Sequence, residues 1–400
     1  MPPASPAQHA SSGDPENPGG FQHIPALDGI RGLAILMVLF FHLFASNPDT
    51  GSRLLDLLNR IRESCYLGVN LFFVLSGFLI TGILLDTRAL PHFFKTFYAR
   101  RTLRIFPLYY GVLLVLFLLT RPLHFIWSGW PIYYLTYTAN LALWTVGPLN
   151  LHAFNINHFW SLQVEEQFYL VWPFLVYRIK RLQTLITFSL VACAAILTLR
   201  IILVALRPRL HNLYLPYSPT FSCADNLLFG CTLCALLRTP ARQRILALAP
   251  RILTICAVIL IVAGLRYHGL LWETNFFIPT FGFTLVAISF AAFIAMALRR
   301  GSKTQQLFSN SALRFFGKYS YGIYVFHYSL ETMLNSPTRL YVSNHLHSKA
   351  LGVLAGACVV MAATIPVALL SYHFYESRFL SLKRYFSYNK KETSTPLQAT

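Results

Sequence analysis

Long stretches of apolar, nearly uncharged residues recur along the whole of this 400-residue chain. Each is close to the length that crosses a hydrocarbon core of roughly 30 Å, which is about 20 helical residues. Composition agrees, because only 12% of the residues are charged and 55% are hydrophobic, whereas about a quarter of a soluble domain is charged. The chain is therefore predicted to be an all-α integral membrane protein that forms one helical bundle.

The connections between the apolar windows predict about ten transmembrane helices. All are short except 122–159, which contains the apolar segment 133–146. At about 14 residues this segment is predicted to be re-entrant or interfacial instead of spanning. The ten windows are residues 30–46, 66–86, 105–121, 160–177, 184–206, 222–238, 250–266, 276–298, 316–335 and 350–373.

Lysine and arginine alternate between the two sides of these windows. The connections assigned to the cytoplasm carry 23 of them and the opposite connections carry nine, as the positive-inside rule requires. Both termini are therefore predicted to be cytoplasmic, in a multi-pass protein of the inner (plasma) membrane. An eleventh span at 133–146 would place the later basic clusters on the wrong side. The net charge of +19 reflects these short clusters, so no nucleic-acid partner is expected.

Three regions are predicted: a disordered cytoplasmic tail at 1–22, a transmembrane domain at 23–378 and a basic cytoplasmic tail at 379–400. The first tail has no apolar run, so no cleavable signal peptide is expected. The seven cysteines lie mostly within apolar windows and are predicted to be core residues without disulfides. Cys231 and Cys234 form a C-x-x-C without a second ligand pair, so no metal site is predicted.

Ionisable groups inside membrane spans are costly and are usually functional. Asp28 and Arg31 open the first window, and His42 lies eleven residues after Arg31. At 1.5 Å per residue, His42 lies about 16 Å beyond Arg31, near mid-membrane if Arg31 is at the surface. A neutral imidazole there can take a proton from an alcohol. The alternative is a histidine packed against a neighbouring helix.

Arg101 and Arg104 are one helical turn apart before the third window. Two guanidinium groups on one face suit a phosphate ligand. The alternative is ordinary anchoring at the cytoplasmic surface.

The fourth window begins with a polar and aromatic stripe that is predicted to face inward. Ser161, Glu165, Tyr169 and Trp172 follow helical spacing. Glu166 adds a second carboxyl group with no basic partner nearby in sequence. The alternative places these carboxyl groups in water at the mouth of the helix, and it suits Glu166 better than Glu165.

Two further windows contain polar or small residues. The Ser76-Gly77 step favours close packing of the second helix. The ninth window contains Tyr324 and a second intramembrane histidine, His327.

Together, these stretches resemble the acyltransferase 3 family of integral membrane O-acyltransferases, which modify bacterial surface polysaccharides, lipid-linked sugars and some secreted small molecules. The resemblance extends from His23 to Arg378 and rests on the order of several motifs. At its end, Glu376-Ser377-Arg378 stands where relatives often have E-x-P. The matching residues are Arg31 and His42 for an Arg, ten residues, His pattern, Ser76, Gly77 and Phe78 for S-G-F, Arg101 and Arg104 for R-x-x-R, Trp160, Ser161, Leu162, Glu165, Phe168 and Tyr169 for W-S-L-x-x-E-x-x-F-Y, and Ser320, Tyr321, Tyr324 and His327 for S-Y-x-x-Y-x-x-H.

The resemblance implies acyl transfer from acyl-CoA, with acetyl-CoA as the default donor, to a carbohydrate or lipid-linked hydroxyl. His42 is then the general base, Arg31 or Asp28 organises the donor end, and Glu165 orients the acceptor. Arg101 and Arg104 hold the CoA phosphates. No permanently bound cofactor is expected, and any periplasmic esterase-like partner is expected to be a separate chain. Support is assigned to Ser76, Trp160, Glu166, Tyr169, Tyr324, His327 and Glu376.

A proton-coupled secondary transporter or flippase is the alternative function. In that case His42, Glu165 and His327 form a proton or substrate relay. Consumption of acyl-CoA distinguishes the enzyme from the carrier.

Overall fold

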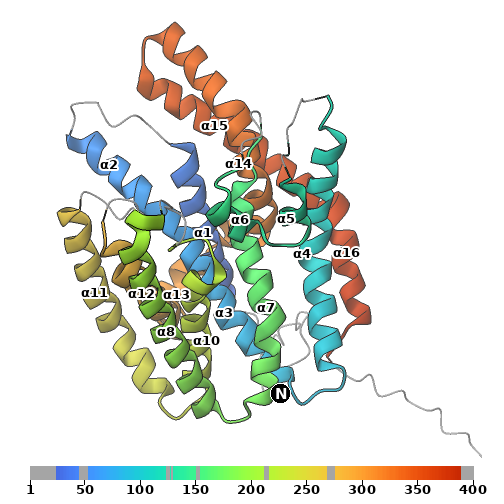
Figure 1. Cartoon of the computed structure of the whole chain (residues 1–400), viewed down its shortest axis with the longest axis vertical. Helices are drawn as coiled ribbons and strands as arrows, with labels where there is room; N and C mark the ends of the chain where they lie inside the picture. The colour runs from blue at the N-terminus through green and yellow to red at the C-terminus, as the bar shows by residue number, and fades with distance from the viewer. Residues whose placement is uncertain are drawn as a thin grey trace, which may run out of the picture.

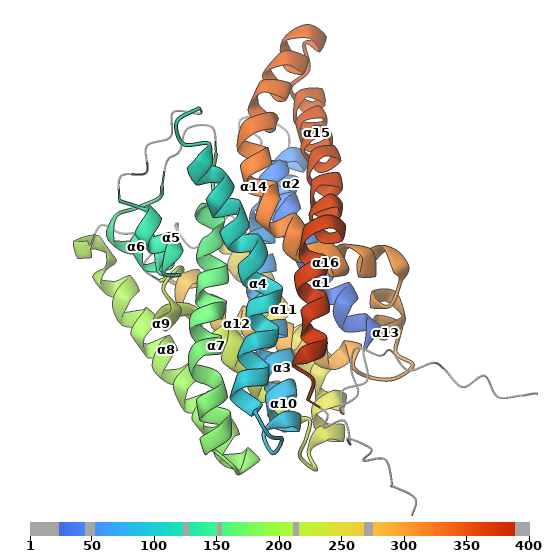
Figure 2. The same ribbon diagram turned by 90° about the vertical axis from the view of Figure 1, so that its right-hand side faces the viewer.

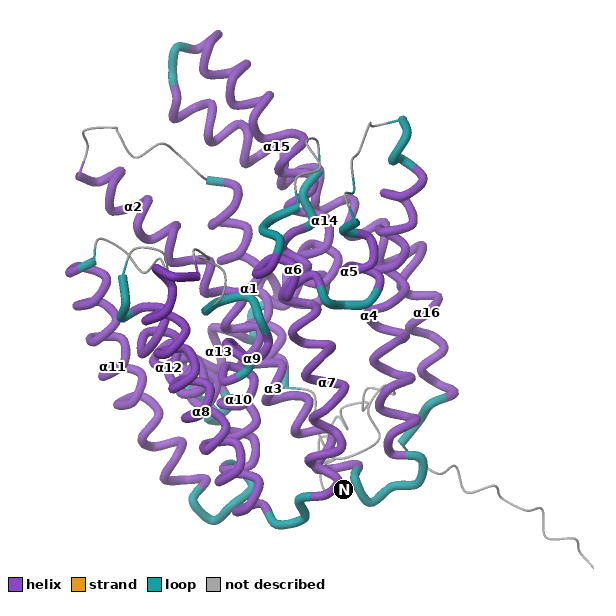
Figure 3. Tube along the Cα trace, viewed as in Figure 1, coloured by secondary structure: helices purple, strands orange, loops and turns teal. Residues whose placement is uncertain are grey.

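The fold was analysed in a computed structural model, in which the described residues form helices, turns and loops without a strand (Figures 1 and 3). The prediction of an all-α protein is therefore confirmed. The described residues are 24–44, 53–122, 127, 129–149, 154–210, 216–267 and 275–388, without the side chains of 53–57 and 207–210. The tail predicted at 1–22 lies outside them, as does most of the tail predicted at 379–400.

Nine helices of 15 or more residues form the bundle, and shorter helices lie between them. The long helices are α1 (Pro25–Leu43), α3 (Gly68–Thr87), α4 (Phe93–Leu118), α7 (Trp160–Arg178), α8 (Leu182–Leu210), α11 (Arg242–Arg266), α12 (Phe283–Ala297), α14 (Ser311–Leu346) and α15 (Lys349–Leu370) within the described part of the chain. The shorter elements are α2 (Arg53–Ser64), η1 (Cys65–Leu67), α5 (Pro131–Leu135), α6 (Ala139–Thr145), η2 (Asn157–Phe159), α9 (Thr220–Cys223), α10 (Asp225–Leu236), η3 (Ile278–Gly282), α13 (Lys303–Phe308), η4 (Ser371–Glu376), α16 (Ser377–Ser381) and η5 (Leu382–Tyr385).

Each of the ten predicted windows falls on helical structure, and seven helical segments of the described chain are long and apolar enough to cross a membrane. The other three windows correspond to α7, α10 and α14. α7 and α14 carry polar residues, and α10 has only 12 residues. The ten-helix count and the orientation of the termini stay predictions.

The ends of α3, α7 and α10 lie together at one end of the bundle (Figures 1 and 2). In the turn after α3, Arg88 Nη1 donates to Lys180 O in the turn after α7, at 3.1 Å. Arg238, just after α10, forms an ion pair with Asp86 of α3 at 3.0 Å. These basic connections therefore occupy one end of the bundle, in agreement with the charge pattern.

The segment 133–146 does not form a spanning helix. It contains α5 and α6, of five and seven residues, separated by Tyr137 at φ 55°. α14, in contrast, is longer than its predicted window 316–335. Its 36 residues extend about 54 Å at 1.5 Å per residue. α14 and α15 project beyond the other helices, away from the turns after α3, α7 and α10 (Figures 1 and 2).

Glycines allow two pairs of helices to approach backbone to backbone. A Cβ on Gly77 of α3 would lie 1.9 Å from Leu227 O of α10. A Cβ on Gly317 of α14 would lie 1.9 Å from Asp28 O of α1. The first contact shows that Gly77 of the Ser-Gly step lets α3 pack closely against α10. The second holds the Asp28 turn of α1 against α14.

A fully buried ion pair joins α8 to α10. Arg200 and Asp225 are both 0% exposed and lie 2.8 Å apart, and Arg200 also donates to Thr284 Oγ1 of α12 at 2.6 Å. Neither residue is among the predicted site residues. The prediction that all cysteines are core residues is wrong for two of them, because Cys65 is half-buried and Cys358 is exposed.

Candidate functional site

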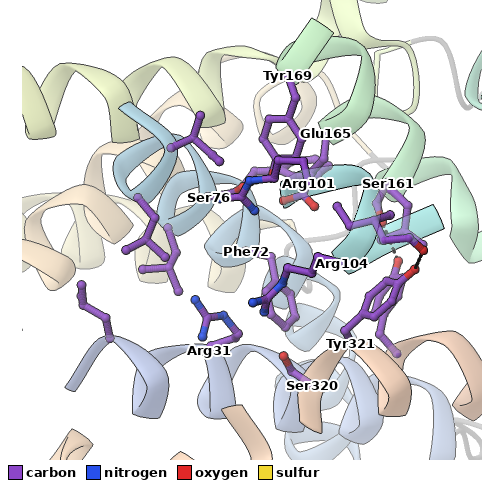
Figure 4. A pocket seen from close by; sticks show the side chains of 18 of the residues that line it. Arg31, Phe72, Ser76, Arg101, Arg104, Ser161, Glu165, Tyr169, Ser320 and Tyr321 are labelled. Carbon is purple, nitrogen blue, oxygen red and sulfur yellow. Dashed lines mark hydrogen bonds between the residues drawn. The ribbon is translucent and has the colours of Figure 1, made fainter. Parts of the chain in front are cut away.

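A cavity of about 360 Å³ lies between α1, α3, α4, α7 and α14. Apolar side chains of α3 cover much of its wall, and polar groups from the other helices face one another across it (Figure 4). The polar side chains of the wall are Asp28, Arg31, Ser76, Arg101, Arg104, Ser161, Glu165, Tyr169, Ser320, Tyr321 and Tyr324.

α1 contributes the ion pair of Asp28 and Arg31 to this cavity. The two residues are three positions apart and therefore share one face of the helix. Arg31 Nη1 lies 2.6 Å from Asp28 Oδ1, with side-chain exposures of 20% and 25%. The pair is partly accessible although it lies in the first turns of a bundle helix, because both side chains line the cavity.

α4 contributes Arg101 and Arg104, which lie on one face as their spacing predicts. The Arg101 guanidinium carbon is 5.3 Å from the centre of the Tyr169 ring. Arg104 is exposed, and its side chain is directed toward Arg31 in Figure 4. Three guanidinium groups from two helices therefore face this cavity.

α7 places its predicted stripe toward the inside of the bundle. Ser161, Glu165 and Tyr169 line the cavity, and Trp172 is 1% exposed. Trp172 Nε1 donates to Thr81 Oγ1 of α3 at 2.8 Å. Tyr169 and Ser76 share a hydrogen bond between their hydroxyl groups, and Figure 4 shows Glu165 beside Arg101.

His42 does not line this cavity. It lies in the last turn of α1, and because the helix begins six residues before Arg31, His42 lies beyond the middle of the helix. Its ring is 5.0 Å from the ring of His327 and 4.5 Å from that of Tyr328. The ring of His158 is 4.9 Å from that of His327. The structure thus brings three histidines together. One of them, His158, lies just before the fourth predicted window and was not among the predicted site residues.

Backbone carbonyl groups determine which nitrogen of each histidine carries hydrogen, because a carbonyl only accepts. His42 Nδ1 donates to Val38 O at 2.9 Å. His327 Nδ1 and His158 Nε2 both donate to Tyr324 O, at 2.7 and 2.8 Å. In the neutral rings, the proton-accepting nitrogens are therefore Nε2 of His42 and His327 and Nδ1 of His158. The last two are buried and have no hydrogen-bond partner among the described residues.

Tyr324 contacts both the cavity and the histidines. Its hydroxyl lies 2.6 Å from Ser161 Oγ and 2.8 Å from His158 O. Its backbone carbonyl accepts from two histidine rings. Tyr324 therefore links the arginine-lined cavity to the histidine cluster, defined as His42, His158 and His327.

The remaining predicted residues lie around these two groups. Trp160 packs on Tyr217, and their ring centres are 4.7 Å apart. Trp160 is not part of the wall of the cavity. Glu376 is 7% exposed and accepts from Ser371 at 3.0 Å. Oε1 of Glu166 is buried and has no hydrogen-bond partner in the described part of the protein, while the residue as a whole is half-buried.

The relatives of this chain agree with the motifs. The profile of a family described as an acyltransferase domain matches residues 24–373. This chain is 28% identical to the peptidoglycan O-acetyltransferase OatA of Listeria monocytogenes and 29% identical to the putative peptidoglycan O-acetyltransferase YrhL of Bacillus subtilis, in each case over 89% of its length. Over 79% of the chain, it is 29% identical to the O-acetyltransferase OatA of Staphylococcus aureus. These alignments cover 56%, 54% and 52% of the relatives.

The chain therefore spans about half the length of the curated relatives that it matches. No solved structure matches it. The profile nevertheless covers most of the chain, including the cavity and the histidine cluster. This chain belongs to the acyltransferase 3 family, the multi-pass enzymes of the plasma membrane that transfer acyl groups.

Proposed function

We propose that this protein moves an acetyl group from cytoplasmic acetyl-CoA onto a hydroxyl of a cell-surface carbohydrate. The main support is the cavity in which Arg31, Arg101 and Arg104 face Glu165 inside a membrane bundle. Guanidinium groups bind phosphate oxygens in a planar, bidentate manner, and CoA is a phosphate-rich donor. Three arginines that face one cavity of a helical bundle repel one another unless they meet an anionic partner.

In the proposed reaction, His42 Nε2 takes the proton of the acceptor hydroxyl. The hydroxyl oxygen attacks the thioester carbonyl carbon, the carbon–sulfur bond breaks, and the proton on His42 passes to the departing CoA thiolate. The bond from His42 Nδ1 to Val38 O keeps Nε2 as the accepting nitrogen. Glu165, in the wall of the donor cavity, orients the acceptor, and Tyr324 connects that cavity to the histidine cluster.

The acceptor is proposed from the relatives. Two of them are named for O-acetylation of peptidoglycan. A glycan hydroxyl on the outer side of the membrane is therefore the proposed acceptor, and acetyl is the proposed acyl group.

The first experiment is a thermal-unfolding titration of the purified protein with CoA, followed by transfer of labelled acetyl from acetyl-CoA to cell-wall glycan in membranes. A ligand that binds only the folded state stabilises it by about 2.7 kcal/mol at 100 times its Kd. We expect stabilisation by CoA, together with acetyl-CoA-dependent labelling of glycan. Movement of a substrate across the membrane without consumption of acetyl-CoA would instead support the transporter, and an absence of CoA binding would contradict the donor.

A further inference from the structure

A second cavity, of about 690 Å³, lies next to the first. The two share Asp28, Arg31, Arg104 and Tyr321 in their walls. The second cavity extends from there along the start of α14 toward η4, α16 and η5. Its volume is within the range of small-molecule sites, about 300–1,000 Å³. No residue of this wall outside the shared border, except Glu376, belongs to the site that the family motifs predict.

Basic side chains dominate the charge of this second cavity. Five cationic groups line it, against two carboxyl groups. One of those carboxyl groups, Asp28, already forms the ion pair with Arg31. The other, Glu376, accepts from Ser371 and is largely buried. The cationic residues are Arg31, Arg104, Arg314, Lys318 and Lys383, so an anionic ligand is favoured there.

Aromatic rings lie among these cations. Tyr319 and Tyr372 pack edge to face, with ring centres 5.1 Å apart. The Lys318 ammonium lies 5.2 and 5.3 Å from their centres, a geometry that holds the cation over the rings. Phe315 adds a third, exposed ring to the wall. Cations beside aromatic rings, of which Phe315 is exposed, suit a ligand that combines phosphates with a planar base.

We propose that the second cavity binds the phosphorylated nucleotide end of the acyl-CoA donor, while the first cavity holds the acylated pantetheine arm. This inference rests on the proposed function. Arg31 and Arg104, at the shared border, contact the diphosphate that joins the two parts of the donor. Arg314 and Lys318 contact the phosphate on the ribose, and the base lies against Tyr319 or Phe315.

The two arginines of the R-x-x-R motif accordingly have different positions relative to the donor. Arg104 lines both cavities, whereas Arg101 lines only the first and packs on Tyr169. The nucleotide end of the donor is thus bound by α14 residues that no family motif includes.

The test compares Arg314→Gln and Lys318→Gln with Lys303→Gln in the full-length purified protein. Arg314, Lys318 and Lys303 are all exposed basic residues, but Lys303 lines neither cavity. Affinities are measured for CoA, for adenosine 3′,5′-bisphosphate and for pantetheine. Each charged hydrogen bond is worth about 1.5–3 kcal/mol, so each cavity variant is expected to weaken CoA and bisphosphate binding about tenfold or more. Pantetheine binding is expected to change much less, and Lys303→Gln is expected to bind all three as the wild type does.

Unchanged CoA affinity in both cavity variants would overturn the inference. If the wild type binds the bisphosphate in this cavity but does not bind CoA, the nucleotide site stands and the proposed donor is wrong. If the variants lose only copurifying anionic lipid and keep their nucleotide affinities, the cavity holds a lipid headgroup and the inference is wrong. Melting temperatures of the three variants confirm that each is folded.

Discussion

At the scale of single residues, the histidine cluster shows how the backbone prepares side chains for proton transfer. Each of the three rings gives its N–H to a main-chain carbonyl. The opposite nitrogen of each neutral ring is therefore a proton acceptor. A base that must take a proton from an alcohol needs this arrangement, because the wrong tautomer would present a donor to the hydroxyl.

His42→Asn tests the general base without removing its structural bond. The asparagine amide replaces Nδ1 and can still donate to Val38 O, but it has no counterpart of Nε2. Since general base catalysis contributes about 10²–10⁴-fold, acetyl transfer is expected to fall by at least about 100-fold. The measurement is the rate of acetyl transfer in membranes, alongside the melting temperature.

His345→Asn is the matched control. His345 Nδ1 also donates to a carbonyl one turn earlier, Tyr341 O at 2.8 Å, but at the exposed end of α14 and away from both cavities. It is expected to retain wild-type activity. Turnover near the wild-type rate in His42→Asn would remove His42 from the base role.

Most of the charged residues in the first cavity could be predicted from sequence, because their charge is conspicuous inside an apolar window or directly before one. Arg31, Arg101, Arg104 and Glu165 were identified in this way, and the structure brings them to one cavity. His158 was missed because it precedes its window. Arg200 and Asp225 were missed although both lie inside windows, because the ion pair joins two different helices. Pairing across helices depends on how the helices pack, which local spacing does not reveal.

At the scale of helices, hydropathy predicted where helices occur better than where they begin and end. The tenth window ends at residue 373, but helical structure continues through η4, α16 and η5 to Tyr385. η3 and η4 are short π-helical turns, which a period of 3.6 residues does not predict. The Ser76-Gly77 step, by contrast, correctly indicated a close helix contact, because only a residue without Cβ fits against Leu227 O.

Gly77→Ala tests that contact between α3 and α10. The new Cβ would lie 1.9 Å from a backbone oxygen, so the helices must separate. Overpacking of this kind costs about 1–3 kcal/mol, and the melting temperature in detergent is expected to fall clearly.

Gly111→Ala on α4 provides the comparison. Its Cβ would lie 3.0 Å from the hydroxyl of Tyr375, the far end of a side chain that can move. It is expected to be as stable as the wild type. Equal melting temperatures for both variants would show that the α3–α10 crossing is not limited by Gly77.

At the scale of the whole molecule, the polar residues that build the site also lower the hydropathy of long bundle helices. α7 carries Glu165 and Glu166, and it is not among the seven apolar spans. The turn after α7 nevertheless meets the turn after α3 through the bond from Arg88 to Lys180 O. Because the chain returns to the same end of the bundle after α3 and again after α7, α4 and α7 both run the length of the bundle, and α7 does so although hydropathy does not mark it as a span.

Cysteine labelling in right-side-out vesicles distinguishes the ten-span topology from one with seven. Ala89→Cys in the turn after α3, Lys180→Cys in the turn after α7 and Asn344→Cys near the end of α14 all introduce a thiol at an exposed position. The background carries Cys65→Ala and Cys358→Ala, because these two native cysteines are not buried.

With ten spans and a cytoplasmic N-terminus, two spans precede residue 89, four precede residue 180 and nine precede residue 344. An impermeant maleimide is therefore expected to label Asn344→Cys in intact vesicles, and to label Ala89→Cys and Lys180→Cys only after permeabilisation. If only the seven apolar segments cross, Lys180→Cys and Ala89→Cys lie on opposite sides. Labelling of Lys180→Cys in intact vesicles while Ala89→Cys stays protected would therefore exclude α7 as a membrane span, and with it the placement of Glu165 inside the bilayer.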